Sequence, residues 1–257
     1  KHHGFTSQLR FKHHGFSLVE LLVVIAIISV LAAMLLPVLD KSLEQARTIA
    51  CANNLKNQNI AFTAYVDDYR KYPTLDTNEC NPQATYFGYG GKCGTETGYP
   101  NRPLNKYLGF SGSATTTTAG ALLVFKCPSD KFSAKGVGQW AREFGLSTWD
   151  QWGFSYFYNA TAQIETVSTP PGPGRLWMWN KRPEDIPHPS RAVLSSDMSF
   201  CCYTMNYNPY SYMYWHNQSI LGYGNVLFVD GHVAYKMATR NKPDYQRGDG
   251  WDFVVTR

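Results

Sequence analysis

The chain has 257 residues, a length that accommodates one sizeable domain or a small domain with an appendage. Apolar residues make up 44% of it and charged residues 17%, proportions that exclude a wholly disordered chain. The net charge is +5, but Lys1, Arg10 and Lys12 supply +3 of it within the first fifteen residues, which contain no acid. The remaining +2 gives no general basic surface, so we expect no nucleic-acid partner.

The first strong signal along the chain is the segment from 21 to 39, which reads LLVVIAIISVLAAMLLPVL. It is apolar throughout except for Ser29, and it contains one proline, Pro37. A helix of this length spans about 28 Å, close to the hydrocarbon thickness of a bilayer. Because positive charge precedes the segment, we expect the N-terminus to stay in the cytoplasm and everything after Asp40 to lie outside it.

Two ordinary interpretations of this segment are a secretory signal peptide, with Ala32 and Ala33 near its cleavage site, and a plain signal anchor. Three observations favour another interpretation. Gly15 and Phe16 stand immediately before the apolar run. Glu20 places a carboxylate in a stretch otherwise suited to lipid, where an ionisable group is costly and indicates a function. The helical pattern also continues beyond the membrane edge.

In these residues the chain resembles type IV pilins and the pseudopilins of type II secretion systems. The resemblance implies that a prepilin peptidase cleaves after Gly15 and that Phe16 becomes N-methylated. It implies that the Glu20 carboxylate pairs with the amino terminus of a neighbouring subunit, and that Pro37 is the kinking proline that many pilins carry. Gly15 and Phe16 are thus the expected processing residues, and Glu20 and Pro37 the expected assembly residues.

The same resemblance implies a role and a location. The expected role is a structural, non-enzymatic subunit of a type II secretion pseudopilus or a type IV pilus-like filament, assembled through the N-terminal helix. The expected partners are the prepilin peptidase, identical or related subunits, an inner-membrane assembly platform and membrane lipid. The chain would be a single-pass protein of the inner (cytoplasmic) membrane with a periplasmic or extracellular head.

Helical periodicity continues after Asp40 and ends near Pro73. Polar residues, among them Glu44 and Asn54, are expected on the outer faces of this stretch. The expected apolar stripe consists of Cys51, Leu55, Phe62, Val66 and Tyr69. The expected parts are a basic leader (1–15), a transmembrane or filament-core helix (16–39), its amphipathic continuation (40–70) and a globular head (71–257).

The head is expected to complete an α+β fold, in which the long N-terminal helix packs on a small antiparallel sheet with long loops. Residues 121–125 and 191–195 are predicted strands. A hairpin is predicted over 225–235, with Asp230 and Gly231 as a two-residue turn. Short islands here and at 51–56 and 127–130 resemble prepilin-like proteins with an H-x9-DG tail, although thirteen residues separate His216 from Asp230 instead of nine.

The six cysteines have no zinc-binding spacing, so no metal site is expected from them. An even number beside a membrane-targeting segment favours disulfides in an oxidising compartment. Fifteen full pairings are possible, and we expect Cys80 with Cys93, closing a glycine-rich loop, and Cys51 with Cys127. The adjacent Cys201 and Cys202 would form a vicinal pair or remain thiols.

Two groups of residues in the head could carry chemistry. Asp197, His216, Asp230 and His232 would make a metal or acid–base cluster if they gathered. The favoured interpretation is structural, with Asp230 as the residue of the hairpin turn and His232 as the start of a strand. The resemblance to pseudopilins also raises the possibility of a Ca²⁺ ion near the C-terminus. Its expected carboxylates are Asp244, Asp249 and Asp252. No nucleotide-binding or hydrolase motif appears, so we expect neither an enzyme nor a further cofactor.

Aromatic residues make up 15% of the chain and gather at 177–179 and 203–215. They favour the core of a loop-rich head, but rings beside polar residues also suit stacking on sugars. The alternative function is therefore a binding protein, anchored by the same helix, whose aromatic head captures polysaccharide.

Overall fold

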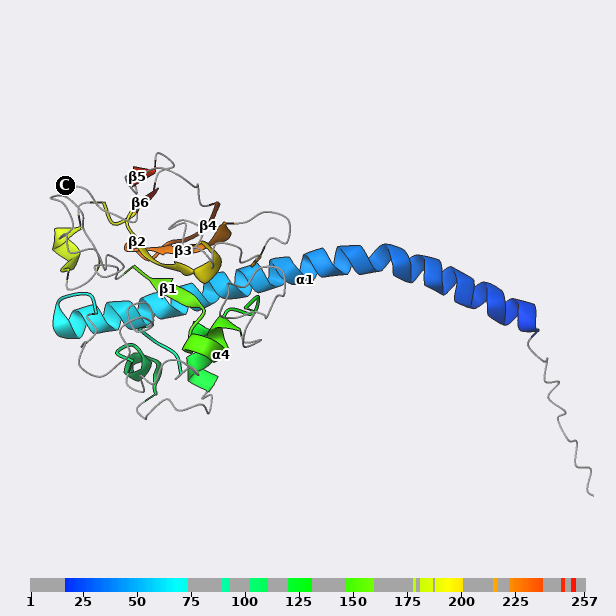
Figure 1. The fold of residues 1–257 in the computed structure, drawn as a ribbon, viewed down its shortest axis with the longest axis horizontal. Coiled ribbons are helices and arrows are strands. Elements are labelled where there is room, and N and C mark those ends of the chain that lie inside the picture. The colour runs from blue at the N-terminus through cyan, green and yellow to red at the C-terminus, as the bar shows by residue number, and fades with distance from the viewer. Residues whose placement is uncertain are drawn as a thin grey trace, which may run out of the picture. The chain divides into compact units, whose positions relative to one another are not determined.

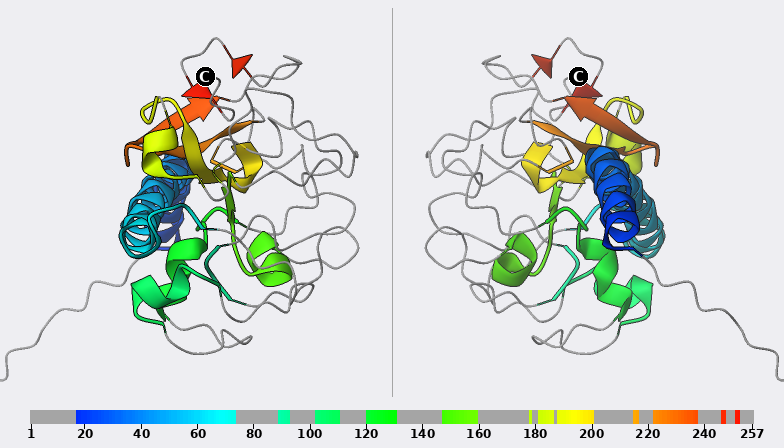
Figure 2. Two further views of the ribbon diagram at one scale, coloured as in Figure 1. Left: turned by 90° about the vertical axis from the view of Figure 1, so that its left-hand side faces the viewer. Right: turned by 90° about the vertical axis from the view of Figure 1, so that its right-hand side faces the viewer.

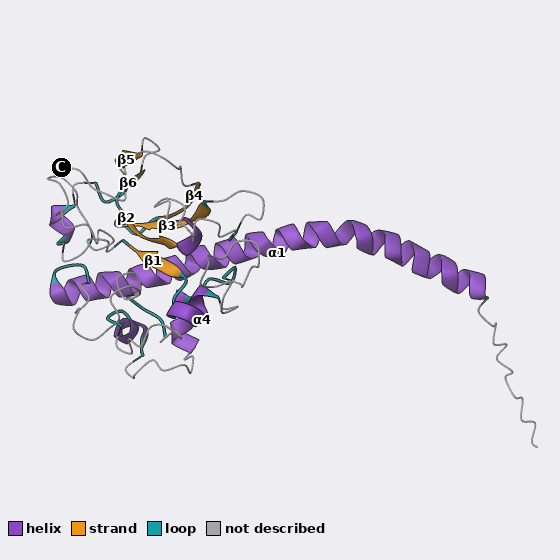
Figure 3. Cartoon of the chain, viewed as in Figure 1, coloured by secondary structure: helices purple, strands orange, loops and turns teal. Residues whose placement is uncertain are grey.

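The computed structural model describes a subset of the chain, and the structural statements below concern that subset. The chain divides into two units, Lys1–Leu43 and Glu44–Arg257. The elements are drawn in Figures 1 and 3. The described residues are 17–73, 89–92, 102–110, 120–130, 147–159, 178, 181–186, 188–200, 215–216, 222–237, 246–247 and 251–252.

One helix, α1, runs from Leu18 to Tyr69 and contributes to both units. The sequence explains both ends, because Ser17 and Glu20 cap its start and Arg70, at φ 57°, leaves the helical region just before Pro73. In the second unit its buried residues recur at helical spacing, so one face points into the head. They are Cys51, Leu55, Gln58, Ala61, Phe62 and Tyr65.

The second unit is built around a four-stranded antiparallel sheet of order β1-β2-β3-β4, which together with α1 gives the expected α+β class. In Figure 2 this sheet lies on one side of the later half of α1, and the green 3₁₀ helices lie on the other. The strands are β1 (Tyr156–Tyr158), β2 (Val193–Asp197), β3 (Tyr223–Phe228) and β4 (Val233–Met237).

Short elements complete the described part of the head. The helix α4, Thr148–Trp152, starts at the N-cap Ser147 and ends at Gly153, which adopts a left-handed φ of 81°. The two-stranded sheet pairs β5 (Gln246–Arg247) with β6 (Trp251–Asp252). The 3₁₀ helices are η1 (Asn105–Leu108), η2 (Gly120–Phe125) and η3 (Pro183–Asp185).

Two local predictions need correction. Residues 121–125 are not a strand, since they form most of η2. The Val124 carbonyl accepts from the Gln58 amide of α1 and the Lys126 carbonyl, just after η2, accepts from the Asn54 amide, so side chains of α1 take the place of a neighbouring strand here. The hairpin of β3 and β4 exists, but its loop is longer than two residues. Gly231 donates to the Phe228 carbonyl and adopts φ 89°, so a turn is followed by a left-handed glycine.

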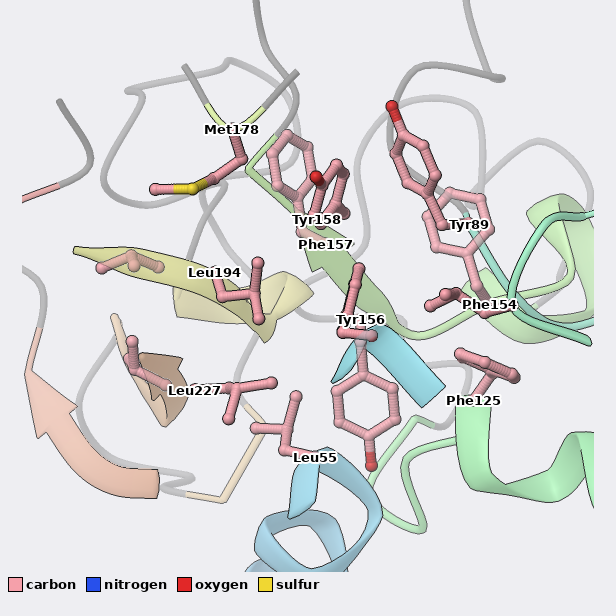
Figure 4. Packing of buried hydrophobic residues seen from close by; sticks show 14 of the residues in the cluster. Leu55, Tyr89, Phe125, Phe154, Tyr156, Phe157, Tyr158, Met178, Leu194 and Leu227 are labelled. Carbon is pink, nitrogen blue, oxygen red and sulfur yellow. The ribbon is translucent and has the colours of Figure 1, made fainter. Parts of the chain in front are cut away.

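The core lies between the buried face of α1, the sheet and the segments around η2 and α4. Figure 4 shows Leu55 of α1 facing Leu194 and Leu227 of the sheet. Aromatic rings fill much of the remaining space, with Tyr158 stacked on Phe62 at 5.1 Å and edge-on to Tyr89 at 4.0 Å between ring centroids. Among the described residues, most aromatic rings are part of the core. Of the two aromatic clusters noted in the sequence, only Trp215 has a described ring, and it is buried; the other rings at 177–179 and 203–215 lie outside the described residues.

Candidate functional site

The described chain begins at a capping box that involves a predicted assembly residue. The Ser17 backbone amide donates to Glu20 Oε2 at 2.8 Å, and the Glu20 amide donates to Ser17 Oγ at 3.2 Å. This reciprocal pair satisfies two amides that a helix start otherwise leaves without partners. The Glu20 carboxylate thus stabilises its own helix start within one chain. The Ser-x-x-Glu spacing in the sequence was the signal for this role.

The helix that follows exposes an almost continuous apolar surface. Its large apolar side chains from Leu18 to Leu39 are between 46% and 79% exposed, and this stretch is long and apolar enough to cross a membrane. Its few polar groups are satisfied locally, since Ser29 Oγ donates to the Ile25 carbonyl at 2.6 Å. Pro37 lies inside the helix, where its nitrogen has no hydrogen to donate. This surface fits single-pass membrane anchoring.

A disulfide joins α1 to the segment after η2 within the second unit. Cys51 and Cys127 are both fully buried, with Cα atoms 5.4 Å apart. This is one of the two pairings expected from the sequence. The other, Cys80 with Cys93, lies outside the described residues, as do Cys201 and Cys202.

A buried histidine stands beside this disulfide. His216 Nε2 lies 3.4 Å from Cys127 Sγ and 3.0 Å from Asp197 Oδ2. On the other side of the ring, Nδ1 lies 3.2 Å from Thr48 Oγ1 and 3.6 Å from Glu44 Oε1. The side chains of His216 and Asp197 are fully buried, and the His216 backbone adopts an uncommon φ of 60°.

The two carboxylates are held by further hydrogen bonds. Asp197 Oδ2 accepts from the backbone amide of Asn225 at 2.6 Å and from its side-chain amide at 3.1 Å. Glu44 accepts from the Ser129 hydroxyl and from Arg47 Nη1 at 3.0 Å. Glu44 and Asn54 were both expected on the outer face of the helix. Instead Glu44 belongs to this cluster, and Asn54 donates to Tyr156 Oη at 3.1 Å.

The charges in this cluster favour a protonated histidine. Burial alone lowers the pKa of His216, but Asp197 and Glu44 outweigh it and raise the pKa to about 9. The hydrogen bond with His216 lowers the pKa of Glu44 to about 2, against the opposing effect of burial. The cluster therefore holds an imidazolium between two carboxylates at neutral pH.

We expect the stability of the disulfide-bonded head to be highest between about pH 4.5 and 6.5. Because the pKa of His216 is raised, its contribution is complete below 6.5 and is lost as the pH rises through about 9. Because the pKa of Glu44 is lowered, its contribution is present above 4.5 and is lost as the pH falls through about 2. The alkaline loss should be on the order of 3 kcal/mol, at about 1.4 kcal/mol per pKa unit.

Unfolding of the full chain in detergent, followed from mildly acidic to alkaline pH, measures this effect. His216→Gln should flatten the alkaline loss, whereas His232→Gln, which changes an exposed histidine, should retain it. An unchanged alkaline loss in His216→Gln would contradict the assignment.

The structure gathers the four sequence candidates as two pairs. Asp197 and His216 meet in the buried cluster, together with the two cysteines. Asp230 Oδ1 contacts His232 Nδ1 at 2.6 Å at the exposed hairpin turn, as the simple structural interpretation expects. Of the acids proposed for calcium, Asp252 lies in β6, while Asp244 and Asp249 lie outside the described residues. Gly15 and Phe16 also lie outside them.

Comparison with known families identifies a motif in the N-terminal segment. Residues 10–36 match the family model of the prokaryotic N-terminal methylation motif. The matched range includes Gly15, Phe16 and Glu20. No curated protein and no solved structure matched the chain. The matched residues run from the basic leader into the exposed apolar part of α1. The N-terminal segment of this chain is therefore a prepilin-type segment of the kind carried by type IV pilin-like proteins.

Proposed function

We propose that the protein is a structural subunit of a type II secretion pseudopilus or a type IV pilus-like filament. A prepilin peptidase removes the leader after Gly15, and the subunit then assembles through the N-terminal half of α1. The observation that carries the proposal is the methylation motif at 10–36, which leads directly into a helix whose large apolar side chains are exposed. Such a surface requires lipid or the helices of other subunits to cover it.

The charge of Glu20 fits this role. Within one chain its carboxylate accepts the Ser17 amide and remains exposed. Cleavage after Gly15 leaves a positively charged amine on Phe16 of each subunit. The Glu20 carboxylate of one subunit would pair with the Phe16 amine of its neighbour. Burial of the apolar helices in a filament makes that charge pair necessary for docking, because an unpaired carboxylate there is costly.

The first test is the intact mass and N-terminal sequence of protein extracted from membranes. A chain that starts at methylated Phe16 supports the proposal. A start near Met34 indicates ordinary signal-peptide cleavage and contradicts it. An uncut leader also contradicts it, and would favour the helix-anchored polysaccharide-binding protein.

Two substitutions at Glu20 separate its charge from its capping role. Glu20→Ala removes both, whereas Glu20→Gln keeps an acceptor for the Ser17 amide and removes only the charge. We expect both variants to be processed normally and both to enter filaments roughly tenfold less than the wild type, or worse. The measurement compares processed subunit in sheared filaments with that in membranes. Normal incorporation of Glu20→Gln would refute the charge-pairing role.

A further inference from the structure

Four side chains that can ligate a metal ion converge in the head from distant parts of the chain. Cys51 belongs to α1, Cys127 follows η2, Asp197 ends β2, and His216 precedes β3. Their ligand atoms all lie within 4.8 Å of one another, and all four residues are buried. We propose that, once the Cys51–Cys127 disulfide is reduced, these four side chains bind one Zn²⁺ ion in a tetrahedral site.

The spacing of the ligand atoms suits this ion. Zinc binds thiolate sulfur at about 2.3 Å and imidazole nitrogen at about 2.0–2.1 Å, so tetrahedral neighbours lie about 3.5 Å apart. The distance between Cys127 Sγ and His216 Nε2 is 3.4 Å, and that between His216 Nε2 and Asp197 Oδ2 is 3.0 Å. Once the sulfur–sulfur bond is broken, the two Sγ atoms can move apart to a similar distance.

Asp197 supplies an independent indication of a ligand. Its Oδ2 receives the hydrogen bonds from Asn225 and faces His216, but its Oδ1 is buried and has no hydrogen-bond partner among the described residues. A buried carboxylate oxygen without a partner is costly and uncommon. A cation bound to this carboxylate would offset that cost.

The surroundings of His216 match those of a zinc-bound histidine. Ligating histidines commonly place the second ring nitrogen against a carboxylate or another acceptor, which fixes the orientation of the ring. Here Nδ1 faces Glu44 Oε1 and Thr48 Oγ1, leaving Nε2 directed at Cys127 and Asp197. Glu44 would thus be a positioning residue for the ion. Two thiolates with an imidazole favour zinc over calcium or magnesium, which prefer oxygen.

The conversion from the disulfide to the zinc site needs two electrons, which a dithiol reductant supplies. The reductant gives two electrons and two protons to the disulfide, breaking the sulfur–sulfur bond to leave two thiols, and is itself oxidised to a disulfide. Zinc then displaces both thiol protons and the proton on His216 Nε2, and all three leave to solvent. The same two sulfur atoms would therefore link α1 to the segment after η2 through a covalent bond when oxidised and through a metal ion when reduced.

The test uses the full chain in detergent with Cys80, Cys93, Cys201 and Cys202 changed to serine, so that only Cys51 and Cys127 remain. The chain is reduced without oxygen and titrated with Co²⁺, then with Zn²⁺. We expect one Co²⁺ per reduced chain, with thiolate charge-transfer bands and a tetrahedral spectrum that Zn²⁺ abolishes. The oxidised chain should show no such spectrum. Octahedral cobalt, or equal binding by the oxidised chain, overturns the proposal.

Variants locate the ion. His216→Gln and Asp197→Asn should each weaken binding by roughly 100-fold or more, and Glu44→Gln by roughly 10- to 100-fold. Asp230→Asn with His232→Gln alters the exposed pair at the hairpin turn and is the matched control, with unchanged affinity expected. A loss of binding in this control but not in His216→Gln would overturn the assignment.

A second measurement covers the case in which the serine variant does not fold. X-ray absorption of the zinc-loaded, reduced wild-type chain should show two sulfur and two lighter ligands, and four sulfur ligands would place the ion elsewhere. Zinc should also raise the unfolding temperature of the reduced chain, since it binds the folded state. A reduced chain that zinc does not stabilise contradicts the proposal.

Discussion

Replacing both Cys51 and Cys127 by alanine is expected to lower the free energy of unfolding of the head by about 4.5 kcal/mol. The two cysteines are 76 positions apart, and closing a loop of that size restricts the unfolded chain by about this amount. Alanine leaves no new polar group in this fully buried site. The measurement is denaturant unfolding of the full chain in detergent, followed by tryptophan fluorescence.

Reduction provides the control for this prediction. In a dithiol reductant with a metal chelator, the wild type loses the same constraint, so its midpoint should fall to within a small margin of that of the variant. A difference of less than about 1 kcal/mol between the oxidised wild type and the variant would show that the disulfide contributes little.

Asp130→Ala is expected to cost roughly 3–5 kcal/mol, because it leaves several buried donors without an acceptor. Asp130 Oδ2 accepts from the Trp149 amide at 2.8 Å, from Ser155 Oγ at 2.6 Å and from the Thr148 hydroxyl, while Oδ1 accepts from the Thr148 amide at 3.0 Å. This carboxylate thus connects the start of α4 to the residue before β1.

Asp130→Asn tests the mechanism of that loss. It keeps one carbonyl oxygen and the shape of the side chain, so its cost should be clearly smaller than that of alanine. The same unfolding assay reads both variants, and Asp150→Ala serves as a control because its salt bridge to Lys92 is partly exposed. Equal losses for Asp130→Ala and Asp150→Ala would contradict the special role of Asp130.

Local patterns in the sequence predicted much of the fold. The apolar run and the helical spacing around Leu55 and Phe62 depend on neighbours within two turns, so α1 was predictable almost to its ends. The β3–β4 hairpin was predictable for the same reason, although the bonds made by Gly231 set a longer loop. Residues 121–125 have the composition of a strand, but they form a 3₁₀ helix in which the Val124 carbonyl accepts from Gln58 of α1, a tertiary contact that the local sequence does not show.

The buried cluster could be predicted only in part. Asp197 and His216 were candidates by residue type, but their meeting with Cys51 and Cys127 depends on tertiary packing. Glu44 looked like a solvent-facing residue because helical periodicity says nothing about which polar face a distant histidine contacts. Cys51 with Cys127 occurs in three of the fifteen full pairings of the six cysteines, and only the fold brings their Cα atoms to 5.4 Å.

The order of the four-stranded sheet has a consequence for solubility. Its outer strands are β1, with three residues, and β4, with five residues that include Lys236. Short edges, and a positive charge on one of them, disfavour the edge-to-edge strand addition through which exposed sheets aggregate. The exposed apolar side chains on β4 are Tyr235 and Met237, which are 42% and 43% exposed. The neighbouring positive charge disfavours their contact with the edge of another sheet. If the head is crowded in many copies, as in the proposed filament, this strand edge would resist non-specific pairing.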